Sequence, residues 1–365
     1  MGDPRVLVAA WVGSTNLGDE LVFRGLRRQL QELGAVVTAV SVDPAATRAT
    51  HGVATVAAGD VAGLVRAARR ADLVVFGGGG LVQDQTSPWN TPYHLSRVWA
   101  ARAGRTPVVA IGLGAGPLDT RLATALTRIT LAPLRGITTR DATSAGVLES
   151  LGIDGVTVAA DLALSLPVPD VVVDDHLVVA LRPWRRRRRR LPVAVARGGP
   201  AAPAWFVAGA ASALDAASVA TGLEVRLVAL QGDRDGPLHD QVAGRMRAPV
   251  TTCRPHLDDV VDEVARGRVV VAMRYHALVA AVLGARPGVA IGYSPKVASL
   301  VADVGTGAVA LDWSPDGLSR LAGAVEQAAA GGDRATEAVE EGRARLRRRE
   351  RANGTALARA LSVPA

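Results

Sequence analysis

Short, continuous apolar segments alternate with helix-like segments along almost the whole chain. The apolar segments lie at residues 6–11, 36–42, 73–76, 108–111, 136–139, 156–159, 177–181, 225–230, 269–273, 288–291 and 308–311. The helix-like segments lie at residues 19–33, 60–70, 93–103, 120–133, 141–151, 204–221, 237–246, 257–266, 276–283, 295–304 and 333–361. A strand that is apolar at every position is buried on both faces, which is typical of a parallel sheet covered by helices. The alternation therefore predicts an α/β fold.

The chain is too long for one ordinary hydrophobic core, since it has 365 residues. The alternation is broken once near its middle, at Pro167-Val168-Pro169-Asp170. We therefore expect two similar α/β domains that face each other across a cleft, at residues 1–167 and 168–332. The charged helix predicted over residues 333–365 could pack back on the first domain.

The composition favours a globular cytoplasmic protein. Hydrophobic residues make up 49% of the chain, charged residues 21% and aromatic residues 3%, so Val, Ala and Leu must build the cores. Cys253 is the single cysteine, which excludes a disulfide framework within the chain and suits a reducing compartment. We interpret it as a passive residue. The N-terminus lacks the pattern of a signal peptide, and no apolar stretch reaches the roughly 20 residues of a membrane span.

The chain is strongly basic, with a formal net charge of +8 and a pI of about 10.8. Much of the excess lies in Arg185–Arg190 and in residues 343–351. Such a balance indicates an anionic partner. The Arg185–Arg190 run has two interpretations, a solvated loop or a peripheral contact with acidic lipid at the inner face of the membrane. No nucleic acid is expected, because no aromatic residues interleave with the run.

Glycine and polar residues follow several of the strands predicted in the first half. The strings are Gly13-Ser14-Thr15-Asn16-Leu17-Gly18-Asp19-Glu20, Gly77-Gly78-Gly79-Gly80 with Gln83-Asp84, Gly112-Leu113-Gly114-Ala115-Gly116-Pro117, and Thr139-Arg140-Asp141. Glycines leave room for a ligand or for close backbone approach. Asp19 and Asp141 are expected to cap helices. Open α/β sheets bind ligands at this carboxyl edge.

The second half carries cations and a histidine at equivalent positions. Arg182 follows one predicted strand, Arg274 and His276 follow another, and Ser294-Pro295-Lys296 follows a third. The start of a helix attracts phosphate or carboxylate, and an arginine can hold such an anion with two parallel bonds. A histidine beside it can move a proton near neutral pH. Nearby, Asp233, Asp235 and Asp240 are interpreted as turn and helix-start residues, and no metal site is expected.

Taken in chain order, these sequence motifs resemble those of the polysaccharide pyruvyl transferase family. The matching pieces are Gly13-x-x-Asn16-x-Gly18-Asp19-Glu20, Gly77-Gly78-Gly79 with Gln83-Asp84, Gly112 to Pro117, Thr139-Arg140-Asp141, Ala160-Asp161, Arg182, Met273-Arg274-Tyr275-His276 and Gly292-Tyr293-Ser294-Pro295-Lys296. The chain departs from the family pattern at Tyr275, where leucine is more usual, and in the arginine run that follows Arg182.

The resemblance implies paired Rossmann-like domains of the glycosyltransferase-B type. It also implies transfer of pyruvate from phosphoenolpyruvate to two hydroxyls of a sugar in a cell-surface glycan or its lipid-linked precursor. The implied catalytic residues are His276, Lys296 and Arg140, and the implied donor-binding residues are Arg274, Arg182 and Ser294. The implied acceptor-binding residues are Asn16, Gly18, Asp19, Glu20, Gly78, Gly79, Gln83, Asp84 and Gly114. Neither a cofactor nor a metal is implied.

The chemistry of these residue types fits that reaction independently of the resemblance. Phosphoenolpyruvate carries a phosphate and a carboxylate, so it needs several cations at short range. Addition of a hydroxyl at its C2 needs a proton at C3 and stabilisation of an oxocarbenium-like charge. We assign the proton transfer to His276 and stabilisation of the leaving phosphate to Lys296, with arginines as clamps.

Two other functions remain open from the sequence. A glycosyltransferase that uses nucleotide sugars would share the architecture, and its diphosphate could be held by the same cations. It would need an acidic residue late in the second half, for which Asp303 and Asp312 are the available residues. A non-catalytic protein that binds a glycan or a lipid pyrophosphate is the other alternative.

Overall fold

The computed structural model describes residues 2–85, 87–134, 136–184 and 202–362. The Arg185–Arg190 run lies outside the described residues, so its predicted membrane contact stays a prediction. The chain divides into two compact units. Unit 1 contains the chain up to Ser14, Asp19–Leu166 and the chain from Leu346 onward, and unit 2 contains Thr15–Gly18 and Pro167–Arg345.

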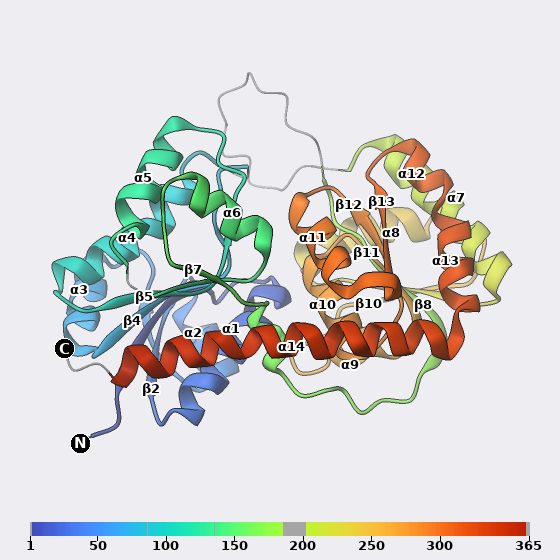
Figure 1. Cartoon of the computed structure of the whole chain (residues 1–365). Coiled ribbons are helices and arrows are strands. Elements are labelled where there is room, and N and C mark those ends of the chain that lie inside the picture. Colours follow the sequence, from blue (N-terminus) through green and yellow to red (C-terminus); the bar gives the residue numbers. More distant parts are fainter. Residues whose placement is uncertain (1, 86, 135, 185–201, 363–365) are drawn as a thin grey trace. The chain divides into compact units, whose positions relative to one another are not determined.

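Unit 1 is built on a seven-stranded parallel sheet with strand order β3-β2-β1-β4-β5-β6-β7. Its strands are β1 (Arg5–Val12), β2 (Val36–Ser41), β3 (Ala54–Ala57), β4 (Leu73–Val82), β5 (Val108–Ala115), β6 (Ile137–Thr139) and β7 (Val156–Val158). Its helices are α1 (Leu17–Glu32), α2 (Pro44–His51), α3 (Val61–Arg70), α4 (Asn90–Ala103), α5 (Arg121–Leu131), α6 (Ala142–Ser150) and the 3-10 turn η1 (Leu162–Ser165). Helices cover both faces of this sheet (Figure 1).

The two faces of that sheet have separate cores, because successive side chains of a strand point to opposite faces. Leu7 and Ala9 of β1 belong to the core under α3 and α4, whereas Val6 and Val8 belong to the core that Phe23 of α1 completes. The continuous apolar runs predicted from the sequence are therefore needed to fill two cores at once.

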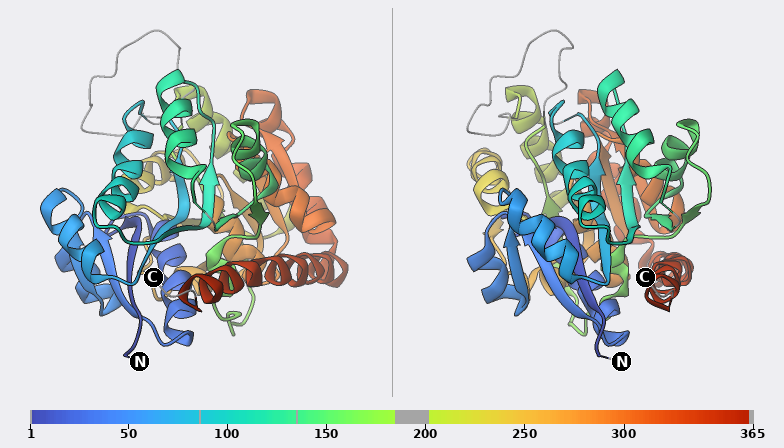
Figure 2. Two further views of the ribbon diagram at one scale, coloured as in Figure 1. Left: turned by 60° about the vertical axis from the view of Figure 1, so that its left-hand side comes forward. Right: turned by 90° about the vertical axis from the view of Figure 1, so that its left-hand side faces the viewer.

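Unit 2 is built on a six-stranded parallel sheet with strand order β10-β9-β8-β11-β12-β13. Its strands are β8 (Asp174–Ala180), β9 (Glu224–Val228), β10 (Val250–Cys253), β11 (Gly267–Ala272), β12 (Gly288–Gly292) and β13 (Ala308–Asp312). Its helical elements are α7 (Ala204–Thr221), α8 (Gly232–Ala243), α9 (Val260–Ala265), α10 (Tyr275–Leu283), α11 (Pro295–Val304), η2 (Gly305–Gly307), α12 (Pro315–Ser319), α13 (Leu321–Ala330) and the first part of α14 (Gly332–Ser362). Figure 2 shows both sheets from two further sides.

Helix α7 belongs to the core of unit 2, where Phe206, Ala210 and Leu214 are buried. Among the described residues it is the one helix long and apolar enough to cross a membrane, judged by length and composition alone. This is weak evidence, because core helices pass the same test.

Each sheet has one point at which the strand order reverses, between β1 and β4 in unit 1 and between β8 and β11 in unit 2. At such a point the loops after two neighbouring strands turn to opposite faces and leave a crevice at the carboxyl edge. The sequence strings that begin at Gly13 and Gly77 lie at the first reversal, and Arg182 and Arg274 lie at the second.

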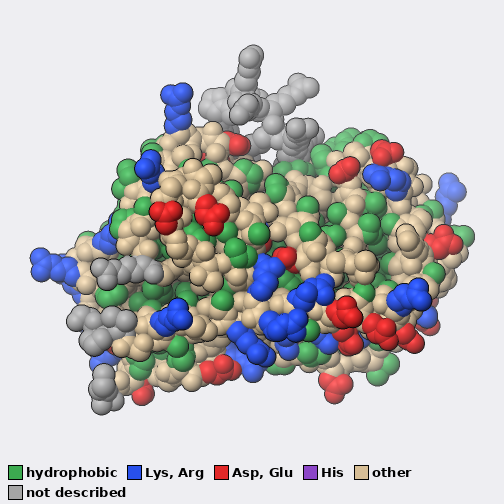
Figure 3. Space-filling model, viewed as in Figure 1, with side chains coloured by type: hydrophobic (Ala, Val, Ile, Leu, Met, Phe, Trp, Pro, Cys, Tyr) green, Lys and Arg blue, Asp and Glu red, His purple; other side chains and the backbone are tan. Residues whose placement is uncertain are grey.

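The last part of α14 belongs to unit 1 and is hydrogen-bonded to the rest of it. The buried Asn353 accepts a bond of 2.6 Å from Thr138 and donates one of 3.0 Å to the carbonyl of Ala160. Gln29 of α1 donates to Glu350. Burial has the largest effect on the pKa of the Glu350 carboxyl and raises it to about 7. Lys and Arg side chains gather along the middle of α14 (Figure 3).

Several predicted boundaries are wrong for identifiable reasons. Strand β4 continues through Gly77–Gly80 to Val82, because β5 pairs with it up to Ala115. Helix α1 begins at Leu17, which places Asp19 in its first turn rather than at its cap. Helix α8 begins at Gly232 and contains Pro237, which was expected to start it. The sequence pattern does not predict α2, β3, η1, β10, α12 or α13.

Candidate functional site

The unit 2 part of the candidate site lies at the ends of three neighbouring strands, β8, β11 and β12. Arg182 follows β8, Arg274 follows β11, and Ser294 precedes the first residue of α11 after β12. His276 lies in the first turn of α10, and Lys296 lies in the first turn of α11. The parallel register brings the ends of these strands to one edge, so the cations predicted from separate motifs lie on the same edge of unit 2.

Arg274 is held in a buried hydrogen-bond network. Its Nε donates to Asp235 over 2.8 Å, its Nη2 also donates to Asp235, and Nη2 donates to Gln231 over 3.1 Å. Asp235 is fully buried, and it also accepts a bond of 2.9 Å from the backbone N–H of Gln231. A two-bond ion pair of this kind fixes the plane of the guanidinium. Asp235 is therefore more than the helix-start residue expected from the sequence.

Arg182 lies among aromatic rings. Its Nη1 donates to the Tyr293 hydroxyl over 2.8 Å, and its guanidinium carbon lies 5.0 Å from the Tyr293 ring centroid and 5.9 Å from that of Trp184. The rings of Trp184 and Tyr293 are themselves 4.7 Å apart. Contact with aromatic faces suits arginine because its planar cation is weakly hydrated.

His276 is buried to 8% exposure and lies against Gly18. A β-carbon added to Gly18 would fall 2.2 Å from Nδ1 of His276, so glycine is required for this approach. The two residues meet because Thr15–Gly18 group with unit 2, although the chain on either side belongs to unit 1. The backbone N–H of Leu17 donates to the carbonyl of Leu230 over 2.9 Å, and Thr15 donates to Asp233 over 2.9 Å.

This segment also contains Asn16, which the sequence assigned to the acceptor. Its side-chain oxygen accepts a bond of 3.3 Å from the backbone N–H of Gly18, so Asn16 shapes the turn that presents Gly18 to His276. Lys296 lies near the same helix start, with its Nζ 6.0 Å from the ring centroid of Tyr275. Tyr275 in turn makes an edge contact with the His276 ring at 5.2 Å.

Tyr293 is a site residue whose role the sequence did not predict, although its motif was recognised. Burial by itself raises the pKa of its phenol. The positive charges of Lys296, Arg182 and Arg274, together with the hydrogen bond from Arg182, outweigh that effect and lower the pKa from 10.0 to about 8. The three cations therefore create an environment that favours negative charge.

This environment can be measured directly on the three tyrosines of the chain. We expect the ultraviolet absorbance of tyrosinate to rise in a step near pH 8, because Tyr293 loses its proton there. In Tyr293→Phe that step should disappear, while Tyr93→Phe should keep it. A step near pH 8 that survives in Tyr293→Phe would contradict the assignment.

The predicted site residues of unit 1 form a separate group around Arg140, which is 5% exposed. Its Nε lies 3.3 Å from Asp141 and its Nη1 lies 4.0 Å from Asp161. Asp141 also caps α6, as the sequence predicted. A β-carbon on Gly114 would fall 2.8 Å from the guanidinium carbon of Arg140. The glycine in β5 is thus needed to accommodate this cation.

The glycine run of β4 lies beside that cation. Gly77, Gly78 and Gly79 have φ values of 139°, 76° and 98°, which other residues rarely adopt. A β-carbon on Gly80 would lie 3.5 Å from Arg140, and one on Gly79 would lie 3.6 Å from the Asp19 carboxylate. Gly77 to Gly79 are buried and Gly80 is exposed, so the run lies between a cation and a carboxylate of unit 1 and reaches the surface at Gly80.

Three of the predicted acceptor residues have structural contacts. Glu20, buried to 5% exposure, accepts from the backbone of Ser14 over 2.9 Å and contacts His51 at 2.8 Å. Asp84 accepts from the backbone of Asp119 and Thr120 over 2.8 and 2.7 Å. The carbonyl of Gln83 accepts from Asn90 and Thr91. These bonds hold the loops in place, and any contact of the three residues with an acceptor stays a prediction.

Among the described residues, no group of three or more His, Cys, Asp or Glu could hold a metal ion.

Comparisons with known proteins agree with this architecture. The sequence model of the polysaccharide pyruvyl transferase family matches residues 16–295. No curated protein sequence matches the chain significantly. A glycosyltransferase from Rickettsia africae has a similar structure, with a TM-score of 0.59 and 9% identity over 97% of each chain. The UDP-GlcNAc 2-epimerase of Neisseria meningitidis bound to UDP-GlcNAc has a TM-score of 0.59 and 11% sequence identity over 99% of each chain.

The UDP-GlcNAc 2-epimerase of Methanocaldococcus jannaschii, in complex with UDP-GlcNAc and UDP, has a TM-score of 0.55 and 11% identity over 90% of this chain and 93% of that one. At these identities the likeness shows the fold alone. It confirms the predicted class, two Rossmann-like α/β domains of the glycosyltransferase-B type.

Proposed function

Because this chain belongs to the polysaccharide pyruvyl transferase family, we propose that it moves pyruvate from phosphoenolpyruvate onto two hydroxyls of a sugar. The product would be a cyclic ketal on a cell-surface polysaccharide or its lipid-linked precursor, with release of phosphate. The observation that carries the proposal is the set of Arg182, Arg274, His276 and Lys296 on adjacent strand ends of unit 2. A small donor with two anionic groups needs such a set.

In the first step, the oxygen of one sugar hydroxyl bonds to C2 of phosphoenolpyruvate while C3 takes a proton. His276 supplies that proton and recovers one from the attacking hydroxyl, so the imidazole ends the step unchanged. In the second step, the oxygen of the second hydroxyl bonds to C2, its proton passes to the departing phosphate, and the bond from C2 to the phosphate oxygen breaks. Phosphate leaves with the bonding electron pair, and Lys296 stabilises its charge.

The remaining residues have binding roles in this proposal. The phosphate and carboxylate of the donor are held by Arg274, Arg182 and Ser294. Asp235 fixes the orientation of the Arg274 guanidinium. In unit 1, Arg140 acts as a catalytic cation, and the backbone at Gly78, Gly79 and Gly114 receives the acceptor with Asp19. We place the activity in the cytoplasm, at the inner face of the membrane where lipid-linked precursors are available.

The proposal is tested by phosphate release from phosphoenolpyruvate with a panel of glycan acceptors, followed by mass analysis for the added ketal. Phosphate release that depends on an acceptor, together with the ketal mass, supports it. Release of a nucleotide from a nucleotide sugar would instead indicate a glycosyltransferase, the fold of which is shared. Glycan binding in calorimetry without phosphate release would indicate a binding protein.

Gly18→Ala tests the role of His276 without removing the imidazole. The added methyl group would overlap Nδ1 of His276, so the ring must move. We expect the turnover to fall by about 10- to 100-fold, because small displacements of a catalytic group are costly. Alanine is a good helix former, so the fold should survive. Gly323→Ala in α13 is the matched control, since a β-carbon there meets no atom within 4 Å. Equal turnover in the two variants would argue against a catalytic imidazole.

A further inference from the structure

An unusual share of the exposed apolar side chains of unit 1 lies on two neighbouring helices. Trp89, directly before α4, is 71% exposed, Tyr93 and Trp99 of α4 are 39% and 38% exposed, and Leu122 and Ile129 of α5 are 52% and 65% exposed. We call these five residues the α4–α5 face. The whole chain has only six Trp and three Tyr, so three exposed aromatic residues within residues 89–99 require an explanation.

The two helices form one rigid surface. Nε1 of Trp99 donates to Oγ1 of Thr130 over 2.9 Å, and Arg102 donates to the carbonyl of Thr130 over 2.7 Å. The ring of Tyr93 lies under the guanidinium of Arg97 at 4.1 Å and makes an edge contact with Trp11. The rings of Tyr93 and Trp99 are therefore held in place by their neighbours while more than a third of each residue stays exposed.

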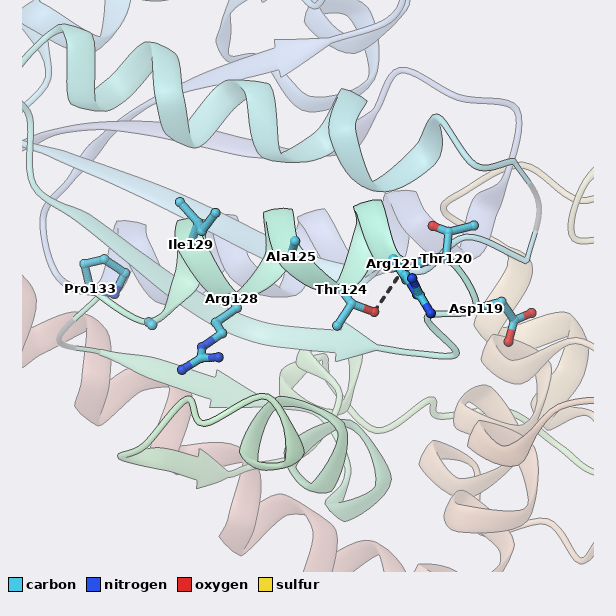
Figure 4. Close-up of a pocket in the computed structure, with 9 residues that line it drawn as sticks. Asp119, Thr120, Arg121, Thr124, Ala125, Arg128, Ile129 and Pro133 are labelled. Carbon is cyan, nitrogen blue, oxygen red and sulfur yellow. Dashed lines mark hydrogen bonds between the residues drawn. The ribbon is translucent and has the colours of Figure 1, made fainter.

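A groove with a volume of about 720 Å³ runs along α5 beside this face. Its lining includes Arg121, Thr124, Ala125, Arg128, Ile129 and Ala132. Figure 4 shows Arg128 and Ile129 projecting on different sides of α5, so basic and apolar groups alternate across its surface. Hydrophobic and basic side chains also lie together over α5 in the space-filling view (Figure 3).

Basic residues outnumber acidic residues in this part of the chain. Residues 88–134 contain one acid, Asp119, which lines the groove, and five arginines, Arg97, Arg102, Arg105, Arg121 and Arg128. Tryptophan and tyrosine beside arginine suit a membrane interface, because their rings enter the apolar boundary while the cations meet lipid phosphates.

We propose that the α4–α5 face docks unit 1 onto an anionic phospholipid bilayer. The aromatic and aliphatic side chains enter the boundary between headgroups and acyl chains, and the surrounding arginines bind headgroup phosphates. This contact goes beyond the proposed transfer of pyruvate and does not depend on it. It also differs from a contact through Arg185–Arg190, which the sequence suggested.

The test uses the whole chain without any substrate, so its failure would leave the proposed activity untouched. We expect the protein to sediment with phosphatidylcholine vesicles that contain phosphatidylglycerol, to sediment less as salt is added, and to stay in solution with phosphatidylcholine alone. Trp89→Ser/Ile129→Ser should weaken binding by about tenfold or more. Arg121→Glu/Arg128→Glu should abolish it, because both changes oppose the lipid charge.

Matched variants elsewhere serve as controls. Val61→Ser/Val219→Ser removes apolar side chains that are 68% and 83% exposed, and Arg245→Glu/Arg247→Glu reverses two exposed charges of unit 2. Both should bind vesicles like the wild type. Brominated phospholipid should quench tryptophan fluorescence, and Trp89→Phe should lose much of that quenching.

Three results would overturn the proposal. The first is failure of the wild type to bind anionic vesicles. The second is loss of binding when Arg185–Arg190 are replaced by serine, with full binding retained in Trp89→Ser/Ile129→Ser. The third is self-association of the wild type that the same double variant abolishes, with unchanged vesicle binding, since the face would then belong to a protein contact.

Discussion

Replacement of His276 with alanine is expected to lower the turnover of pyruvyl transfer by about 10²- to 10⁴-fold, because a positioned general acid and base contributes on this order. The imidazole lies in the first turn of α10, between Gly18 and Tyr275. The KM for phosphoenolpyruvate should change much less than kcat, since the arginines remain to hold the donor. Steady-state kinetics of phosphate release measure both quantities.

His256→Ala is the control for that variant, because His256 is exposed on the surface of unit 2. Its turnover and melting temperature should equal those of the wild type. Partial recovery of His276→Ala by added imidazole would support proton transfer by the ring. If His276→Ala retains a tenth or more of the turnover (~10%) with an unchanged dependence on pH, the assignment of proton transfer is wrong.

The second large effect is expected for Asp235→Asn. Its carboxylate is fully buried and makes two bonds to Arg274. An amide cannot neutralise the guanidinium, so the variant keeps an uncompensated buried charge. Breaking a buried ion pair in this way destabilises a protein by about 3–5 kcal/mol. We expect a lower melting temperature, and in the folded fraction a raised KM for phosphoenolpyruvate with a smaller effect on kcat.

Asp240→Asn is the matched control on the same helix, since Asp240 pairs with Arg254 at 3.0 Å while both side chains are more than half exposed. Its effect should stay within about 0.5 kcal/mol. The double variant Asp235→Leu/Arg274→Met removes both charges and should recover much of the stability without recovering activity. Wild-type stability and KM in Asp235→Asn would show that the ion pair neither supports the fold nor orients Arg274.

The sequence was sufficient to predict the fold class and to place the cations of unit 2 on strand ends. These inferences depend on local patterns, since a continuous apolar strand and the residue after it are adjacent in the chain. Arg182, Arg274 and Lys296 could therefore be recognised one strand at a time. The reversal of strand order that brings their strands together follows from the fold class.

The partners of these residues could not be predicted in the same way. Asp235 lies 39 positions before Arg274, and Thr15 lies 218 positions before its partner Asp233. Nothing in the local pattern distinguishes such an aspartate from one that starts a helix. The glycines at 77–80 were placed after their strand because glycine is typical of turns, whereas pairing with β5 keeps them in the sheet.

The division of the chain has a consequence for the order in which the protein can fold during synthesis. Asn353 and Leu357 are fully buried in unit 1, yet they are translated after all of unit 2. Until they emerge from the ribosome, Thr138 and the carbonyl of Ala160 lack the partners that α14 supplies. Although domains generally fold from the N-terminal side first, unit 1 begins earlier here and is completed last.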